Sequence, residues 1–296
     1  MPRVLISGAS GLFGSALARS LAAQAYEICR LVRRPAENSQ EREYHPDQPI
    51  APSLVSGMHL VIHLAGENVA GRWTGSKKSR IRESRVLSTR HLSRALGLAA
   101  EKPRMFLCAS AIGFYGDRGD ETLSEASSSH PGFLAEVCRE WEAATHPASE
   151  AGIPTINLRI GVVLSPKGGA LKAMLAPFRL GLGGRIGSGR QWWSWIHLAD
   201  LVGAVLHIIQ SGGPTGPVNL TAPEPVRNRQ FTADLAESLR RPALLPVPAW
   251  LAQAGFGEFA REGLLASARV LPQKLLDDGF RFQFPELTRA LKDLLP

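Results

Sequence analysis

A glycine-rich turn, GASGLFG at residues 8–14, constrains the fold of this chain more than any other feature. A short apolar run, 3–7, precedes the turn, and helix-spaced apolar residues follow it over 12–24. Gly8 permits a tight turn, Gly11 lets backbone approach a diphosphate, and Gly14 allows close packing of helix on strand. The unpaired N–H groups of a first helical turn also favour an anion. Strand, turn and helix in this order predict a dinucleotide site. Its expected residues are Gly8, Ser10, Gly11, Leu12, Phe13 and Gly14.

Apolar runs of strand length alternate with helical patterns over the rest of the chain. Strands are expected at 26–32, 60–64, 105–109, 155–164 and 218–220, and helices at 77–100, 133–149, 198–209 and 230–239. Continuous apolar strands separated by helices indicate a parallel sheet covered on both faces. We therefore predict an α/β fold with a doubly wound, Rossmann-like parallel sheet and a smaller, mainly helical carboxyl-terminal substrate region.

Three prolines within residues 242–248 end this alternation and mark a connection. The predicted domains are a nucleotide-binding domain over 1–240, with substrate loops at 165–197, and a helical domain over 241–296.

Composition narrows the class of protein. With 296 residues, 44% hydrophobic and 20% charged, the chain has the content of a globular protein with a sizeable core. No apolar run reaches the ~18 residues that a membrane-spanning helix needs, and regularly spaced glycines interrupt the amino-terminal run that could imitate a secretory signal. The three cysteines have no CxxC spacing, which supports neither a disulfide framework nor a metal site. We expect a soluble, cytoplasmic protein without metal or membrane partner.

The end of the second expected strand indicates which dinucleotide binds. An acid about 20 residues beyond the glycines would bind the ribose hydroxyl of NAD. The sequence there is CRLVRRPA, with Arg33 and Arg34 in place of an acid. Because guanidinium groups bind phosphate strongly, these residues favour NADP. The alternative is that both arginines only solvate a strand end.

The strand at 60–64 ends in VIHLAG, where Leu64, Ala65 and Gly66 would let a cofactor pass close to the sheet edge. His63, alone within this apolar strand, is expected to be a hydrogen-bonded core residue.

Positive charge is concentrated in one segment. Residues 71–104 hold ten basic and two acidic residues, a difference equal to the net charge of +8 of the whole chain. These cations surround a helix and have one aromatic neighbour, Trp73, so no nucleic-acid partner is expected. Arg85, with Arg72, is expected to face the cofactor diphosphate or an anionic substrate. The charge on 77–100 opposes self-association and favours a monomer or weak dimer.

The chain resembles the extended short-chain dehydrogenase/reductase superfamily. More narrowly it is similar to the sugar epimerase-like proteins with an extra carboxyl-terminal domain of unknown function (DUF1731-like), labelled NAD-dependent epimerase/dehydratase or, for some members, cell-division inhibitor. The motifs that carry this resemblance, over nearly the whole chain, are GASGLFG, VIHLAGENVAGRW, SRVLSTRHL, SAIGFYGDRGDE, LRIGVVLSPKGGAL, WSWIHLADLV and VLPQKLLDDGFRF.

The resemblance implies that Ser110 hydrogen-bonds a substrate carbonyl or hydroxyl. The superfamily pairs this serine with a tyrosine and a lysine, but the corresponding stretch, PGFLAEVCREWE, contains neither. Either Tyr115 or a bound water would then move the proton, or Tyr115 is only a packing residue. Two functions stay open. One is an oxidoreductase or epimerase acting on an unidentified small carbonyl or sugar-like substrate, and the other is a catalytically silent NADP(H) sensor or regulator, linked by family label to cell division.

A second glycine-rich segment, 181–197, combines Arg185 and Arg190 with three tryptophans. It is either a lid over a small ligand or a turn followed by core tryptophans. His197 and Asp200 resemble the superfamily's HxxD, and Asp200 is expected to be a helix-start contact.

Overall fold

A central sheet of seven parallel strands organises the protein, whose structure is a computed structural model describing residues 1–295. In sheet order the strands are β11 (Gly216–Leu220), β7 (Thr155–Ile160), β5 (Met105–Ala111), β4 (Leu60–His63), β1 (Arg3–Ser7), β2 (Glu27–Val32) and β3 (Glu41–Glu43). Each neighbouring pair is parallel. The predicted Rossmann-like sheet is thus confirmed.

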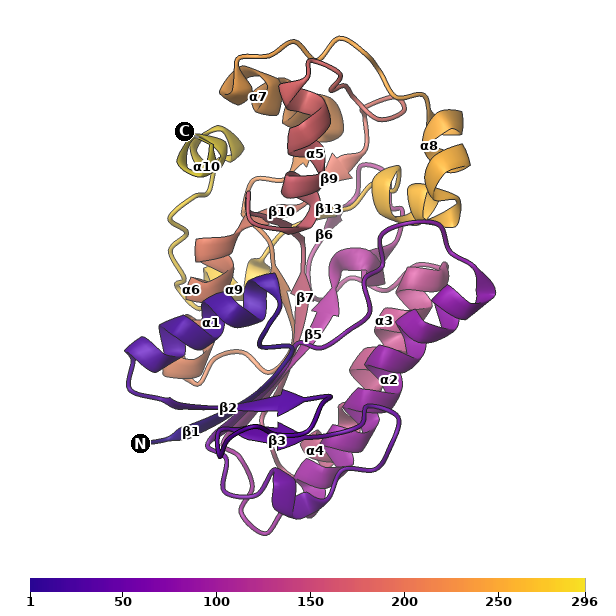
Figure 1. The fold of residues 1–296 in the computed structure, drawn as a ribbon. Coiled ribbons are helices and arrows are strands. Elements are labelled where there is room, and N and C mark those ends of the chain that lie inside the picture. Colours follow the sequence, from indigo (N-terminus) through magenta and orange to yellow (C-terminus); the bar gives the residue numbers. More distant parts are fainter. Residues whose placement is uncertain (296) are drawn as a thin grey trace.

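Helices cover both faces of the sheet (Figure 1). On one face lie α1 (Leu12–Ala23) and α6 (Leu198–Ser211), and on the other α2 (Gly75–Leu98), α3 (Phe133–Ala143) and α4 (His146–Glu150). Side chains alternate between faces along a strand, so the strands contribute to two cores. Val4 and Ile6 pack against α1 and α6, whereas Leu5 packs on the α2 side.

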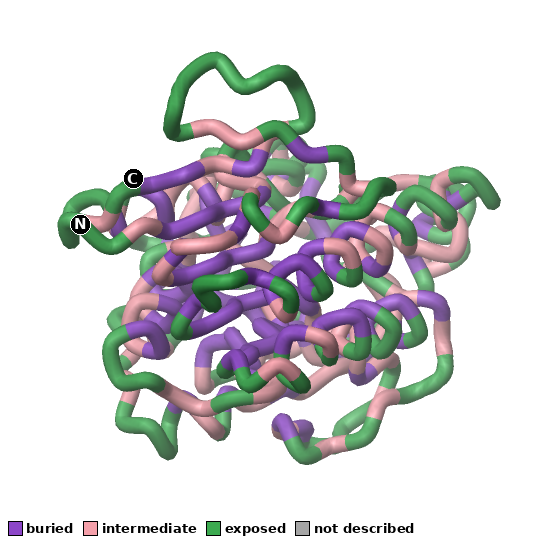
Figure 2. The backbone as a smooth tube through the Cα atoms, turned by 90° about the horizontal axis from the view of Figure 1, so that it is seen from below, coloured by how far each residue is buried: buried purple, intermediate pink, exposed green. Residues whose placement is uncertain are grey.

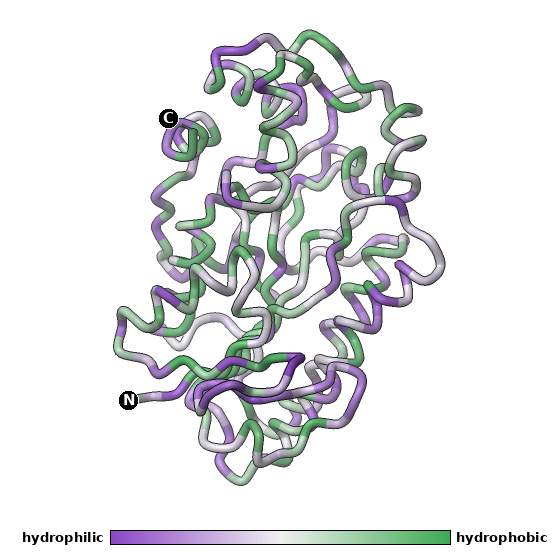
Figure 3. Tube along the Cα trace, viewed as in Figure 1, coloured by the Kyte–Doolittle hydropathy of each residue, from purple (hydrophilic) through white to green (hydrophobic). Residues whose placement is uncertain are grey.

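Burial on both faces explains why the strands read as unbroken apolar runs. Hydrophobic residues follow the central strands in Figure 3, and the same strands form a buried interior in Figure 2. The three cysteines belong to this interior. Burial raises the pKa of the Cys108 thiol to about 12.

The carboxyl-terminal elements interlock with earlier parts of the chain. They are β12 (Val226–Arg227), α7 (Asn228–Leu239), α8 (Ala249–Phe256), the π-helical turn η3 (Ala260–Leu264), β13 (Arg269–Val270), α9 (Gln273–Asp277) and α10 (Leu287–Leu294). Strand β13 pairs with β6 (Thr122–Leu123), and β12 pairs with β9 (Trp192–Trp193). Helices α7 and α10 share a third core with α5 (Gly169–Arg179). The domain division at residue 240 stays a prediction.

Three expected elements differ in the structure. The strand expected at 155–164 breaks at Gly161, after which β8 (Val162–Leu164) leaves the main sheet and pairs with β10 (Trp195–His197). The helix expected at 133–149 divides into α3 and α4 because Pro147 has no N–H to continue it. The segment 165–197, expected to consist of loops, contains helix α5 and two short strands. Short 3-10 turns, η1 (Pro52–Leu54) and η2 (Ile112–Tyr115), complete the described elements.

Within residues 1–295, no helix combines the length and the apolar character required to span a bilayer.

Candidate functional site

The glycine turn lies at the carboxyl edge of the sheet, between β1 and α1. Gly8 has a φ of +70°, and a Cβ there would lie 2.9 Å from the backbone N of Ala65. A Cβ on Gly14 would collide with the carbonyl oxygen of Gly8, whereas one on Gly11 would lie 3.3 Å from that oxygen. Both Ser10 and Gly11 are exposed. The first and third glycines therefore serve the protein's own packing, whereas a Cβ on the second would make one tight contact, with the Gly8 carbonyl oxygen.

The amino end of α1 can receive an anion. No side chain caps the helix, and its first turn contains no acidic residue. The backbone N–H groups of Leu12 and Phe13 reach no acceptor in the described chain. Because such groups carry partial positive charge, the diphosphate of a dinucleotide fits this turn. Gly168, which precedes α5, packs against Leu12 and brings the loop after β8 to the same edge.

A buried hydrogen-bonded cluster fixes the end of β4 beside this turn. Ser7 Oγ accepts hydrogen bonds from the backbone N–H groups of Leu64 and Ala65, at 3.2 and 3.3 Å. It also lies 2.6 Å from His63 Nδ1, and His63 Nε2 lies 3.1 Å from Ser88 Oγ. Burial lowers the pKa of His63 to about 4. The imidazole is thus a neutral, hydrogen-bonded core group, as the sequence indicated.

The two arginines at the end of β2 differ in their contacts. Arg34 holds Glu41 through two nitrogen–oxygen contacts of 2.9 and 2.8 Å, and contacts Glu37 at 3.0 Å. The hydrogen bond from Arg34 lowers the pKa of Glu41. Arg33 is exposed, and the structure of residues 1–295 gives its side chain no hydrogen bond or ion pair. Of the predicted phosphate-binding pair, Arg33 is therefore the available cation.

Arg85 lies beneath Gly66, where a Cβ would be 3.1 Å from its Cζ. Its guanidinium donates to the carbonyls of Ile81 and Glu67, at 3.1 and 2.9 Å, and stacks on Trp141 with a 5.1 Å separation. Burial lowers its pKa. Its role toward an anion stays a prediction, because much of the side chain is already held by the protein.

A row of polar residues crosses the carboxyl ends of β5, β7 and β11. Ser110 is paired in register with Arg159, and Arg159 with Asn219. Ser110 Oγ donates to Glu142 Oε1 at 2.7 Å. Arg159 donates to the same carboxylate through Nε and NH2, both at 2.8 Å. Ser110 and Arg159 are buried, and Glu142 is nearly so, which makes this bidentate ion pair the electrostatic centre of the network.

Tyr115 continues the network away from Ser110. Its hydroxyl donates to Asn219 Oδ1 at 2.7 Å and accepts from Arg159 NH1 at 2.9 Å. The residue has no exposed surface, and burial raises its pKa. Because the hydroxyl is buried and its hydrogen is donated to Asn219, this geometry favours the loop-anchoring role over proton transfer, and a proton-transfer role for Tyr115 stays a prediction.

The residues around the start of α3, in the stretch PGFLAEVCREWE that lacks the superfamily's tyrosine and lysine, are mainly apolar. Phe133 packs edge-on against Trp73 with a 5.1 Å centroid separation, and Leu134 approaches Gly113. Val137 is buried. Burial raises the pKa of Cys138 to about 12, so this thiol does not exchange protons near neutrality.

The aromatic segment after β8 is mostly fixed in the core. Trp193 and Trp195 are buried, and Trp192 donates to Asp120 Oδ1 at 2.8 Å. Asp200 lies in the first turn of α6, at the expected helix start, but its hydrogen bonds reach further. Its carboxylate accepts the backbone N–H groups of Gln283 and Phe284, at 2.8 and 2.9 Å, and so anchors the carboxyl-terminal tail.

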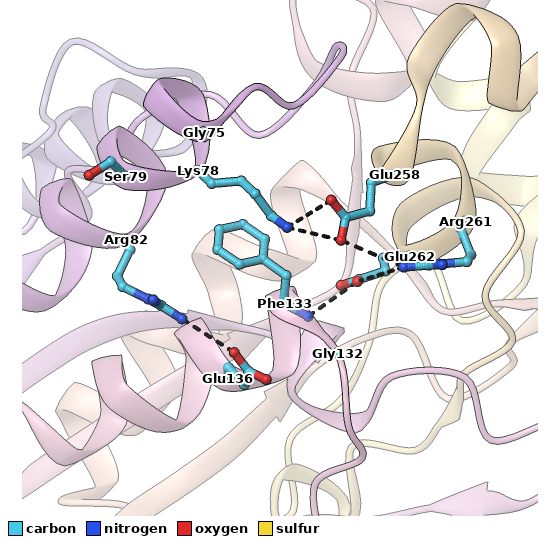
Figure 4. Close-up of a pocket in the computed structure, with 10 residues that line it drawn as sticks. All are labelled: Gly75, Lys78, Ser79, Arg82, Gly132, Phe133, Glu136, Glu258, Arg261 and Glu262. Carbon is cyan, nitrogen blue, oxygen red and sulfur yellow. Dashed lines mark hydrogen bonds and ion pairs between the residues drawn. The ribbon is translucent and has the colours of Figure 1, made fainter.

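A cavity of about 540 Å³ lies between the amino ends of α2 and α3 and the 258–262 segment (Figure 4). Most of its charged residues pair with one another across the elements, although the buried Nε of Arg82 lies 3.3 Å from Glu140 Oε2 without a hydrogen bond. Lys78 pairs with Glu258 at 2.7 Å, and Arg82 with Glu136 at 3.3 Å. Mutual neutralisation leaves this cavity without a strong charge preference for a ligand.

Known proteins identify the family. The model of the NAD dependent epimerase/dehydratase family matches residues 4–221. This chain belongs to that family. A domain of unknown function, DUF1731, matches residues 247–294, so the resemblance stated from the sequence is confirmed.

Relatives of the epimerase family share nearly the full length of the chain. An epimerase family protein of Mycobacterium tuberculosis is 42% identical over 290 residues, covering 97% of this chain and 96% of the relative. The human epimerase family protein SDR39U1 is 33% identical over 300 residues, covering 99% of each. A crystal structure of human SDR39U1 (isoform 2) with NADPH superposes with a TM-score of 0.89 at 30% identity, covering 99% of both chains. A nucleoside-diphosphate sugar epimerase of Corynebacterium glutamicum gives a TM-score of 0.81 at 37% identity, over all of this chain and 58% of that one.

Sequence reasoning missed Glu142 and Arg159. One signal was available: Arg159 is the charged residue of the otherwise uncharged strand TINLRI. A buried guanidinium requires an acidic partner. Which acid it meets depends on how α3 packs over β5 and β7.

Proposed function

We propose that this epimerase-family protein binds NADP(H) at the glycine turn and acts as an oxidoreductase or epimerase on a small carbonyl or sugar-like substrate. The main observation that supports cofactor binding is the amino end of α1, which has no side-chain cap and follows the exposed Gly11. In this arrangement the diphosphate is surrounded by Gly8, Ser10, Gly11, Leu12, Phe13 and Gly14. The cofactor then passes along the sheet edge next to Leu64, Ala65 and Gly66. NADPH in the human relative supports the same reading.

Arg33 supports the phosphorylated form of the cofactor. It is exposed and unpaired among the described residues, at the strand end where the adenosine ribose is expected. Arg34 is a weaker second contact because Glu41 and Glu37 already hold it. The bound cofactor would supply hydride exchange, and the chain would bind and orient it.

Titration of the purified protein with NADPH and NADH tests the cofactor. NADPH should bind about 10- to 100-fold more tightly, the range expected for charge-assisted hydrogen bonds to phosphate. Arg33→Asp should remove most of this preference and leave NADH affinity nearly unchanged. Equal affinity for both cofactors in the wild type would refute the NADP assignment.

A second candidate, a catalytically silent NADP(H) sensor, is favoured by the network around Ser110. The hydroxyl of Tyr115 donates to Asn219 and accepts from Arg159, and the stretch that would hold the tyrosine and lysine has neither. Stoichiometric NADPH binding without oxidation over a panel of carbonyl compounds would select the sensor. Turnover abolished by Ser110→Ala would select the enzyme.

The proposal includes a small-molecule substrate, no nucleic-acid partner, and a monomeric or weakly dimeric state. Glu136 and Glu140, acids of α3 that could meet the basic helix of a second copy, already pair with Arg82 of their own chain, each at 3.3 Å, which supports the monomeric or weakly dimeric state. Equilibrium sedimentation across protein concentrations would test it.

A further inference from the structure

The hydroxyl of Ser110 has its hydrogen committed inside the protein. Glu142 is held by Arg159 through two contacts of 2.8 Å, in the geometry of an ionised carboxylate with a guanidinium. An ionised carboxylate can only accept hydrogen bonds. The 2.7 Å contact therefore fixes Ser110 as the donor and Glu142 as the acceptor.

The oxygen of Ser110 keeps acceptor capacity that the described chain does not use. A hydroxyl oxygen has two lone pairs, and no side-chain or backbone donor among residues 1–295 is bonded to Ser110 Oγ. Ser110 is the penultimate residue of β5, at the carboxyl edge where doubly wound sheets bind their ligands. A ligand above it would meet a lone pair and no free O–H.

We propose that Ser110, held as an acceptor by the Glu142–Arg159 pair, selects a ligand that presents a hydrogen-bond donor, specifically an alcohol hydroxyl, over the carbonyl of the corresponding ketone. This inference rests on the proposed function, because it concerns the ligand that lies beside the cofactor. It assigns Glu142 as a positioning residue, which acts on the ligand through Ser110.

If the Ser110 hydroxyl rotated to donate to a ligand carbonyl, the preference for the alcohol would be reversed, but this rotation costs free energy. It would replace a hydrogen bond to an ionised carboxylate with one to a neutral oxygen, and charge-assisted bonds are about twice as strong. No other proton in the network is available to compensate. Tyr115 gives its hydrogen to Asn219, and the donors of Arg159 directed at this cluster are used by Glu142 and Tyr115.

The test uses two probes that cannot exchange hydride with the oxidised cofactor. These are 2-(4-fluorophenyl)propan-2-ol, a tertiary alcohol, and 4′-fluoroacetophenone, a ketone. Their affinities for the NADP⁺-loaded protein are measured by fluorine NMR. We expect the alcohol to bind about tenfold more tightly, because the ketone would place an acceptor against an acceptor.

Two variants distinguish a preference set by the Ser110 hydrogen bond from a change in how both probes pack in the site. In Glu142→Gln the acceptor facing Ser110 is neutral, so the hydrogen bond that holds the serine hydrogen is no longer charge-assisted. The hydrogen then turns to a ligand carbonyl more readily, and the advantage of the alcohol over the ketone should shrink or reverse. A merely structural change would weaken both probes alike. Ser110→Ala removes one hydroxyl and should make the affinities equal to within about twofold; it tests the inference even if Glu142→Gln fails to fold.

Equal or tighter binding of the ketone by the wild type would overturn the inference, and so would binding of neither probe. NADP⁺ affinity is measured first on the same samples. Failure to bind NADP⁺ would count against the proposed function, whereas normal NADP⁺ binding with the wrong probe ranking would count against the role of Ser110 and Glu142 alone.

Discussion

Glu262 caps a helix that lies more than a hundred residues earlier in the chain: its Oε2 accepts the backbone N–H of Leu134 at 2.8 Å. Its Oε1 accepts the N–H of Phe133 at 3.1 Å. The residue before the helix is Gly132, which has no side chain to provide a cap. The DUF1731 segment thus supplies the amino-terminal cap of α3, the helix that carries Glu142.

Glu262→Ala should lower the free energy of unfolding by about 1–2 kcal/mol, because two helix N–H groups lose their acceptor. Urea denaturation measures the change. Arg261→Ala is the matched control, since this exposed neighbour makes only longer contacts of 3.6 and 3.8 Å and should change stability by less than about 0.5 kcal/mol. Equal effects of both variants would contradict the capping role.

Gly14 and Gly11 of the turn should respond differently to one added methyl group. Gly14→Ala places Cβ against the carbonyl of Gly8 and should lower the melting temperature sharply or prevent folding. Gly11→Ala meets only one protein oxygen, at 3.3 Å, so the fold should survive while NADPH binding falls at least about tenfold. Thermal melts and NADPH titration of both variants check this. A Gly11→Ala protein with wild-type affinity would place the diphosphate elsewhere.

Glu41 should limit the contribution of Arg34 to cofactor selection. Because Arg34 is bonded to Glu41 in the structure, Arg34→Ala should reduce the preference for NADPH less than Arg33→Ala does. Glu41→Gln weakens that pairing and removes a negative charge, so it should increase the NADPH preference. Fluorescence titrations with both reduced cofactors measure the ratios. A lower NADPH preference in Glu41→Gln would be the opposite of what this geometry predicts.

His63 should make stability depend on pH. An unperturbed histidine gains a proton as pH falls through 6.5, whereas burial holds the folded pKa of His63 at about 4. Between these values the unfolded state binds more protons, so the free energy of unfolding falls as pH falls from 6.5 toward 4, by about 3 kcal/mol in total. His63→Gln should flatten this part of the profile relative to the wild type, measured by urea unfolding at several pH values. Parallel profiles would contradict the assignment.

The main sheet was predictable from sequence because its strands are buried on both sides. Continuous apolar runs as short as LVIH at β4, placed between longer helical patterns, are typical of strands in a parallel sheet. The break at Gly161 was not predictable, because it depends on a distant close approach: a Cβ there would lie 2.8 Å from the carbonyl oxygen of Ser194. Helix α5 could not be predicted because glycines at its start and Pro177 within it are typical of loops.

Local chemistry determined how much of the site could be predicted. The glycine turn is specified by seven consecutive residues, so its position followed directly from the sequence. The partners of Ser110 are 32 and 49 residues away and meet only through strand register and helix packing. Arg33 and Arg34 are neighbours with the same side chain, and the positions of Glu41 on β3 and of Glu37 distinguish them.

Because all three thiols are buried, their reactivity measures the fraction of unfolded molecules. Cys29, Cys108 and Cys138 are at most 4% exposed, so an alkylating reagent added to the native protein should react only when a molecule opens. The labelling rate of each variant discussed above then reports its opening equilibrium without an engineered cysteine. If a variant loses cofactor affinity while its thiols react as slowly as those of the wild type, it has lost a contact with the cofactor and kept its folded structure.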